Sequence, residues 1–208
     1  MSVENGDAAE GPGAEAAAPT PAGRRGSAAG DAGYTDLLGR QRVPKSDPRI
    51  EAIGALDVAT SALGLARSLA AEGRTRRLVQ QAQQDLYEVM AELAFPPQHA
   101  QAVRIGPAHV AWLDRCVATV QAPFAGMTRF VLPGACTASG AVDVARAEVR
   151  TAERRLAHLV HNGQLPNETS LVYLNRLSLL LYYLARAEDV AAGVDFDLAG
   201  GPETRPEA

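Results

Sequence analysis

The sequence predicts an all-α fold, a five-helix up-and-down bundle, and two observations carry this prediction. Apolar residues recur at alternating three- and four-residue steps in about five segments, which is the spacing of one buried helix face. Short connections marked by Gly and Pro separate these segments, and neither an internal repeat nor a strand pattern stands out. Helices joined in this way pack around a single core. We therefore expect a bundle over residues 26–195, between disordered tails at 1–25 and 196–208.

Composition indicates one domain and gives no sign of a nucleic-acid-binding, zinc-binding, secreted or membrane protein. The 208 residues are 47% hydrophobic, and the net charge of −4 gives no bulk basicity for nucleic acid. Cys116 and Cys136 lack CxxC spacing, so neither a zinc site nor a secreted disulfide framework is expected, and we expect no metal held by protein side chains alone. No apolar run is long enough to span a membrane, and residues 1–25 lack the apolar core of a secretory signal. These features predict a cytoplasmic protein.

The first helix follows Ser46 or Asp47, either of which can cap it, with Pro48 in its first turn. Asp57 falls on the edge of the predicted inner stripe, where a carboxylate should be paired or hydrogen-bonded. A partly exposed aspartate is the equally weighted alternative. The inner stripe itself consists of Ile50, Ile53, Leu56, Thr60 and Leu63.

The second and third helices have shorter apolar stripes. The second follows Gly73 and ends at Pro96-Pro97, with Leu78, Ala82, Leu86, Val89 and Leu93 inward. The third starts near Pro107, with Val110, Leu113, Val117 and Val120 inward.

The fourth helix comes after a short apolar run, Phe130-Val131-Leu132, which Pro133-Gly134 turns. Thr137 or Ser139 is the expected N-cap, and the helix ends near Asn162-Gly163. Arg146, Arg150 and Glu153 flank its apolar seam, as rim residues of a monomer or as interface residues of an oligomer. On pattern alone a solvated helix face is favoured. The seam consists of Val142, Ala145, Val149, Ala152, Leu156 and Leu159.

The fifth helix runs from about Asn167 to Ala192. Asn175 shares the row of Leu171 and Ser178, and on pattern alone it is a hydrogen-bonded polar residue of the helix. Phe130, by the same standard, is a core aromatic before a turn. The inward residues are Leu171, Leu174, Ser178, Leu181 and Ala185.

Three blocks of sequence together resemble a known family. The blocks run from Arg42 to Gly64, from Phe130 to Arg155, and from Tyr173 to Ser178. In order and spacing they are similar to the trimeric ATP:cob(I)alamin adenosyltransferases of the propanediol-utilisation type. The resemblance covers roughly residues 27 to 189, and each block alone is weak.

The resemblance implies an activity and its partners. The family transfers the 5′-deoxyadenosyl group of ATP to cobalt of cob(I)alamin, releases triphosphate and makes adenosylcobalamin. The implied substrates are ATP with Mg²⁺ and cobalamin. The implied assembly is a homotrimer with inter-subunit sites, and a flavoprotein reductase is a further partner.

The resemblance also assigns roles to particular residues. The family's ATP-binding segment corresponds here to Ser27, Gly30, Asp31, Gly33 and Thr35. Unaided, this stretch is a loop whose glycines allow a ligand to approach the backbone. The remaining nucleotide-binding positions are Lys45, Arg146, Arg150, Glu153, Arg154 and Asn175.

Two further roles come from the same alignment of motifs. Asp57 and Arg150 correspond to a catalytic pair that bridges neighbouring subunits. Phe130 corresponds to the aromatic residue over the corrin ring, which displaces the lower axial base of the cobalamin.

Several positions depart from the family pattern, and they sustain an alternative function. Asp143 replaces a typical histidine and Thr151 replaces an arginine. A diverged bundle that binds corrinoid or nucleotide without catalysis, or that has only a structural role, is the competing hypothesis. The other departures are Ala28, Ala29, Val58, Thr60, Ala135 and Leu179.

Overall fold

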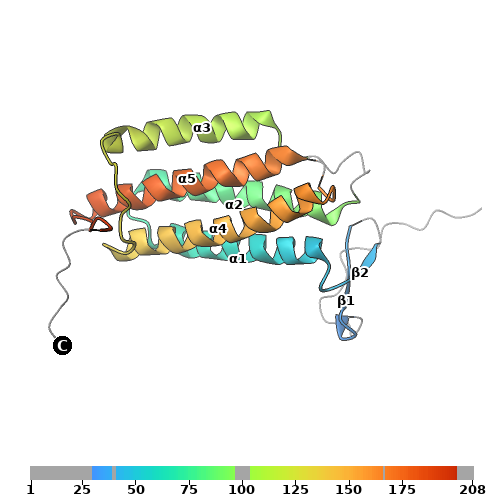
Figure 1. Ribbon diagram of the computed structural model, residues 1–208. Helices are drawn as coiled ribbons and strands as arrows, with labels where there is room; N and C mark the ends of the chain where they lie inside the picture. Colours follow the sequence, from blue (N-terminus) through green and yellow to red (C-terminus); the bar gives the residue numbers. More distant parts are fainter. Residues whose placement is uncertain (1–29, 39–40, 97–103, 166, 201–208) are drawn as a thin grey trace, which may run out of the picture.

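The computed structural model describes residues 30–38, 41–96, 104–165 and 167–200, and they form a five-helix bundle (Figure 1). This confirms the predicted fold class. The elements in chain order are β1 (Tyr34–Asp36), β2 (Arg42–Pro44), α1 (Pro48–Leu69), α2 (Gly73–Ala94), α3 (Pro107–Gln121), the 3₁₀ turn η2 (Ala122–Phe124), α4 (Thr137–His161) and α5 (Glu168–Ala191).

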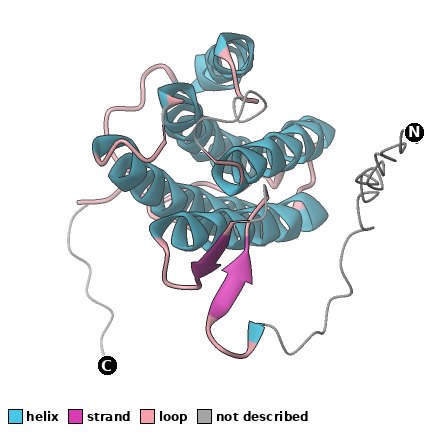
Figure 2. Ribbon diagram, turned by 90° about the vertical axis from the view of Figure 1, so that its right-hand side faces the viewer, coloured by secondary structure: helices cyan, strands magenta, loops and turns pink. Residues whose placement is uncertain are grey.

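The helices are arranged around α1, α4 and α5. Helix α1 packs against α4 and α2, while α5 packs against α4 and α3. Helix α3 therefore lies on the outside of the bundle, along α5 (Figure 1). Figure 2 shows the bundle from the end at which α1 begins, with the strands in front.

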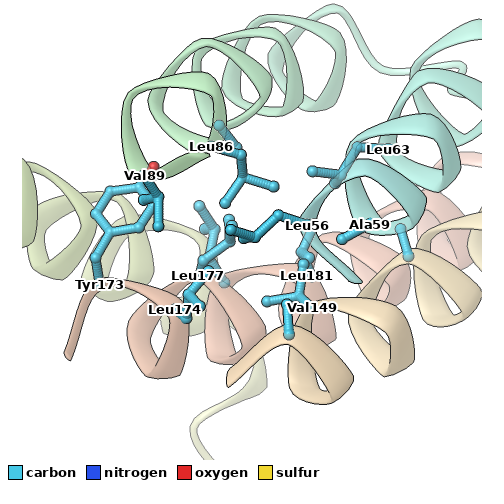
Figure 3. Close-up of a cluster of buried hydrophobic side chains, with 14 of the residues drawn as sticks. Leu56, Ala59, Leu63, Leu86, Val89, Val149, Tyr173, Leu174, Leu177 and Leu181 are labelled. Carbon is cyan, nitrogen blue, oxygen red and sulfur yellow. The ribbon is translucent and has the colours of Figure 1, made fainter. Parts of the chain in front are cut away.

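The core is built from the apolar stripes that the sequence predicted. All six seam residues predicted on α4 are fully buried, and Figure 3 shows Val149 among side chains of α1, α2 and α5. Each fully buried aliphatic side chain contributes about 1.5–3 kcal/mol, so these stripes hold the bundle together. By length and composition α1 could also cross a membrane, but seven of its residues are buried inside the bundle. A buried core helix has the same apolar composition.

The β-hairpin was not predicted. Strands β1 and β2 pair antiparallel with Thr35 opposite Val43, and each strand has only three residues. A strand of this length is too short to show an alternating pattern in the sequence. Gly33 precedes the hairpin with φ of 78°, a backbone conformation that glycine adopts without strain.

Helix ends confirm some predicted caps and correct one. Asp47 caps α1, because its Oδ1 accepts a hydrogen bond from the backbone N–H of Arg49 at 2.9 Å. On α4 the predicted cap was wrong: Cys136 is the N-cap, and its Sγ accepts from the Ser139 N–H at 3.4 Å. Ser139, three residues further along, makes the reciprocal hydrogen bond of a capping box, because its Oγ accepts from the Cys136 N–H at 3.1 Å. The helix ends at Asn162-Gly163, as predicted.

Ordered structure continues beyond the predicted end of the bundle. The backbone N–H of Leu132 donates to the Asp197 carbonyl at 2.8 Å, and the Ala199 N–H donates to the Phe130 carbonyl at 2.7 Å. Part of the segment predicted as a tail thus has backbone partners in the loop before α4. We refer to residues 196–200 as the C-terminal strap.

Candidate active site

A hollow of about 430 Å³ lies between the loop that precedes α4 and the facing sides of α4 and α5. It brings together four residues that the sequence had singled out, namely Phe130, Arg146, Arg150 and Asn175. We call this hollow the Phe130 pocket. Its lining combines aromatic rings with guanidinium groups, and the remaining lining residues are Met127, Thr128, Arg129, Ser178, Leu179, Tyr182 and Tyr183.

Phe130 is unusually placed for its residue type. Its side chain is 81% exposed, so the alternative that it is a core aromatic is wrong. The backbone at Phe130 is nonetheless fixed, because its carbonyl accepts the hydrogen bond from Ala199 of the C-terminal strap. A fixed backbone with an exposed ring leaves an apolar face available to a flat ligand.

Arg146 enters the same pocket from α4 and is half-buried. Its Nε donates to Oδ1 of Asp143 at 3.1 Å, one turn earlier on the helix. The other oxygen of Asp143, Oδ2, accepts from Nη2 of Arg186 at 2.7 Å. Asp143 thus joins an arginine of the pocket to an arginine of the core.

Arg186 is fully buried on α5 and is bound by a second carboxylate. Its Nε donates to Oδ2 of Asp189 at 2.8 Å. Burial opposes the charge of Arg186, but hydrogen bonds and charge from Asp143 and Asp189 outweigh burial and raise its pKa above the ordinary value. Sequence analysis missed this cluster, although the three-residue spacing of Asp143 and Arg146 could have indicated their pairing.

A second hollow, of about 480 Å³, adjoins the Phe130 pocket further along α4. We call it the Glu153 hollow. It shares Arg150 and Asn175 with the first and adds Glu153 and Arg154. Asn175 spans the two helices, since its Nδ2 donates to Oε1 of Glu153 at 2.9 Å. All five predicted residues of α4 and α5 therefore line two neighbouring hollows.

The predicted pair of Asp57 and Arg150 is not formed within one chain. Both side chains are exposed, and neither has an ion-pair or hydrogen-bond partner in the part of the chain that the structure describes. Asp57 lies one turn from the half-buried Ile53 and the buried Thr60, but its own side chain is exposed. The alternative, an exposed aspartate, describes the single chain.

The glycine-rich segment lies around the hairpin. The Lys45 N–H donates to the Gly33 carbonyl at 2.8 Å, and Nζ of Lys45 lies 3.6 Å from the position that a Cβ on Gly30 would occupy. Asp31 is exposed, and Thr35 belongs to β1. Ser27 lies outside the described residues.

The hairpin and the Phe130 pocket are at opposite ends of the bundle. The hairpin adjoins the start of α1, where α4 ends, whereas the loop with Phe130 adjoins the start of α4 (Figure 1). Helix α4 has 25 residues, so its length is about 37 Å. Within a single chain the hairpin is therefore separated from the Phe130 pocket, whereas Arg154 also lines a hollow with Ser46, the residue after Lys45.

The site contains no obvious metal centre of its own. Among the described residues, no group of three or more His, Cys, Asp or Glu side chains is placed to hold a metal ion.

Known proteins with similar sequences are corrinoid adenosyltransferases. The family model described as cobalamin adenosyltransferase matches residues 27–188. The corrinoid adenosyltransferase PduO of Salmonella typhimurium is 38% identical over 162 residues, which are 77% of this chain and 48% of that protein. A corrinoid adenosyltransferase of Mycobacterium leprae is 34% identical over 176 residues, which are 79% of this chain and 91% of that protein. The chain thus spans about half the length of the PduO relative and most of the second one.

A solved structure agrees with the sequence relatives. It is a variant of a PduO-type ATP:corrinoid adenosyltransferase from Lactobacillus reuteri, complexed with cobalamin and ATP. Its TM-score is 0.75 at 28% identity, and the match covers 83% of this chain and 97% of that chain. The family model covers most of this sequence, and the fold and the relatives agree with it, so the chain belongs to the cobalamin adenosyltransferase family.

Proposed function

We propose that this protein transfers the 5′-deoxyadenosyl group of ATP to cobalt of cob(I)alamin, releasing triphosphate and forming adenosylcobalamin. The observation that carries the proposal is the Phe130 pocket, where an exposed aromatic ring shares one hollow with the two arginines of α4, Arg146 and Arg150. The ring suits the flat corrin, and the guanidinium groups suit the phosphates of ATP. The Lactobacillus reuteri structure, which holds cobalamin and ATP together, supports this pairing of ligands.

In the proposed reaction, Co(I) acts as the nucleophile. A cobalt–carbon bond forms at C5′ of ATP, the C5′–oxygen bond breaks, and its electron pair leaves on triphosphate. Because Co(I) is itself strongly nucleophilic, the protein has to align C5′ with cobalt and stabilise the leaving charge. Arg146 and Arg150 supply positive charge inside the pocket, and Arg154 supplies it in the adjoining Glu153 hollow. We propose that ATP binds as its magnesium complex, in which the cation bridges phosphate oxygens.

Phe130 has a separate role in this proposal. Its exposed ring takes the place of the lower axial base of the corrinoid, which makes four-coordinate Co(II) and eases its reduction. Because the reaction consumes Co(I), we propose a flavoprotein reductase as the partner that supplies it, and a cytoplasmic location for both.

We further propose that the active protein is a homotrimer with sites between subunits. Val58, Leu65 and Leu69 form one stripe along α1, and each is 42–54% exposed in the single chain. Asp57, next to this stripe, and Arg150 both lack partners within the described chain. A neighbouring subunit would cover the apolar stripe and bring a hairpin to a Phe130 pocket that its own hairpin cannot reach.

One assay tests the activity. Reduced cobalamin, magnesium-ATP and the protein are mixed without oxygen, and the visible spectrum is followed, with ATP omitted in the control. We expect the spectrum of adenosylcobalamin to appear only with ATP. Binding of ATP or corrinoid without this product would instead support the diverged, non-catalytic bundle. Light scattering on a sizing column tests the assembly, and a monomer at micromolar concentration would contradict the trimer and the shared site.

A further inference from the structure

We propose that Asp143 is a positioning residue, which holds the guanidinium of Arg146 at the wall of the Phe130 pocket and is itself fixed by the buried Arg186. The proposal rests on the proposed function, because it concerns how the pocket receives a polyphosphate. It assigns a role to the aspartate that stands where the family pattern has a histidine.

Asp143 bridges two arginines. Its side chain is only 4% exposed, and its two oxygens serve different arginines. Oδ1 accepts from Nε of Arg146 at 3.1 Å, and Oδ2 accepts from Nη2 of Arg186 at 2.7 Å. Arg146 lines the pocket, whereas Arg186 is fully buried. Because Arg186 is fixed in the core, the carboxylate of Asp143 also fixes the position of Arg146 at the pocket.

The bridge through Asp143 is stronger than an ion pair on an exposed helix face. A helix pair of residues three apart contributes only about 0.2–0.5 kcal/mol on an exposed surface, too little to hold one rotamer. A buried carboxylate shared with a buried arginine is different, because loss of either partner leaves a charge without compensation. Arg186 is also held by Asp189 and by the rings of Tyr182 and Phe196, whose centroids lie 5.6 and 5.9 Å from its Cζ.

Arg146 keeps free hydrogen-bond donors for a ligand. Its Nε is used by Asp143, and no other hydrogen bond or ion pair of Arg146 occurs within the described residues. Both Nη groups thus remain for phosphate oxygens, in the fork geometry that pairs with them two at a time. Without Asp143, the same side chain would sample several rotamers and lose entropy on each binding event.

The cluster also supplies its own control. Asp189 binds Arg186 at Nε, is fully buried, and has no hydrogen bond or ion pair with Arg146 among the described residues. Asp143→Asn and Asp189→Asn therefore make the same chemical change beside the same buried arginine. Only the first also removes the carboxylate from Arg146.

The experiment compares these variants by ATP titration calorimetry, by KM for ATP and kcat, and by urea unfolding, alone and combined with Arg146→Ala. We expect both to lower the unfolding midpoint. We expect Asp143→Asn alone to weaken ATP binding, by about tenfold, with KM raised more than kcat is lowered. In the Arg146→Ala background, Asp143→Asn should have no further effect, because the group that it positions is gone.

Several outcomes would overturn the inference. Equal losses of ATP affinity in both variants would mean that the cluster acts only on stability, and so would an undiminished effect of Asp143→Asn in the Arg146→Ala background. If Asp143→Asn does not fold, Asp143→Glu replaces it, since it keeps the charge on Arg186 and displaces Arg146; unchanged ATP affinity would then be the contradicting result. A wild-type protein that binds ATP without transferring adenosyl would refute the proposed function while leaving the affinity comparison decisive. A wild-type protein that binds no ATP would refute both.

Discussion

At the scale of single residues, Phe130 shows that the surroundings of a side chain, and not its residue type alone, decide whether it is buried. Phenylalanine is usually buried, and a short apolar run before a turn predicts a core position. The structure instead exposes 81% of the side chain, while its backbone is tied to the C-terminal strap. Exposure of a large ring costs hydration free energy, so a ligand that covers it is the natural compensation.

Phe130→Ala tests the proposed role of this ring. We expect the variant to lose more activity when cob(II)alamin is reduced in the assay than when pre-formed cob(I)alamin is supplied. In the proposed role the ring favours the four-coordinate Co(II) that can be reduced, and pre-formed Co(I) bypasses this step. The two rates are measured side by side in the visible spectrum.

Leu132→Ala is the matched control for this measurement. Leu132 lies in the same loop and is 52% exposed, but it does not line the Phe130 pocket. We expect it to leave the ratio of the two rates unchanged. Equal losses in the two assays for Phe130→Ala would show that the ring merely supports the loop.

The arginines of α4 could be found from the sequence, whereas their buried support could not. Arg146 and Arg150 follow a recognisable motif, and the structure puts them in one pocket. Arg186 is different, because it ends an apolar run and a charge at that point predicts a helix surface. Its full burial depends on two carboxylates, one of them 43 residues away, and helix periodicity says nothing about such a distant partner.

At the scale of elements, the apolar stripes predicted the helices well, and the ends of the helices depended on contacts between elements. Helix α2 begins without a side-chain cap from its own residues. The carboxylate of Glu188, on α5, accepts from the N–H groups of Ala71 and Glu72 at 2.7 and 3.3 Å. A cap borrowed from a helix more than a hundred residues later cannot be recognised in the local sequence.

Glu188→Gln should therefore destabilise the bundle by about 1–3 kcal/mol, because an amide supplies one acceptor oxygen where the carboxylate supplies two. The free energy of unfolding in urea measures this change. Glu72→Gln is the control, since it removes an exposed carboxylate at the same helix end, and it should change the stability by less than about 0.5 kcal/mol. Similar small losses in both variants would show that Glu188 does not cap α2.

The C-terminal strap gives a second prediction about elements. A chain that ends at Asp195 loses the backbone bonds of Asp197 and Ala199 to the Phe130 loop, and it loses Phe196 from the face of Arg186. We expect its thermal midpoint to fall only slightly, because few core residues are removed, but its affinity for cobalamin to fall several-fold as the loop loses its partner. Titration of cobalamin, followed by absorbance, measures this affinity.

The control is a chain that ends at Gly200, which keeps the strap and removes only the residues after it. We expect this chain to bind cobalamin as the full sequence does. If both shortened chains bind equally well, the strap has no part in holding Phe130.

At the scale of the whole molecule, one chain contains both halves of the proposed site but keeps them apart. The hairpin with Gly30, Gly33 and Lys45 lies at one end of α4, and the Phe130 pocket lies at the other (Figure 1). The sequence predicted the residues of both halves without showing this separation, because motif order says nothing about distance along a bundle. In the proposed trimer a neighbouring subunit brings these halves together, so we expect assembly and nucleotide binding to depend on the same residues.

The pair of Asp57 and Arg150 offers the sharpest test of that dependence. Both are exposed and without partners within the described chain, so any strong interaction between them has to cross a subunit boundary. Loss of one member of a desolvated pair costs roughly 3–5 kcal/mol, whereas an exposed pair contributes less than about 1 kcal/mol. We expect Asp57→Ala and Arg150→Ala each to weaken the trimer and ATP binding, and the double variant to be clearly less damaged than the sum of the two. Trimer dissociation is followed by light scattering on dilution, and ATP affinity by calorimetry.

Arg155→Ala is the control, because Arg155 already has Glu51 within 4.0 Å in its own chain, and its effect should add to that of Asp57→Ala. Additive effects of Asp57→Ala and Arg150→Ala would mean that the two charges never meet, and the proposed site between subunits would lose its central contact.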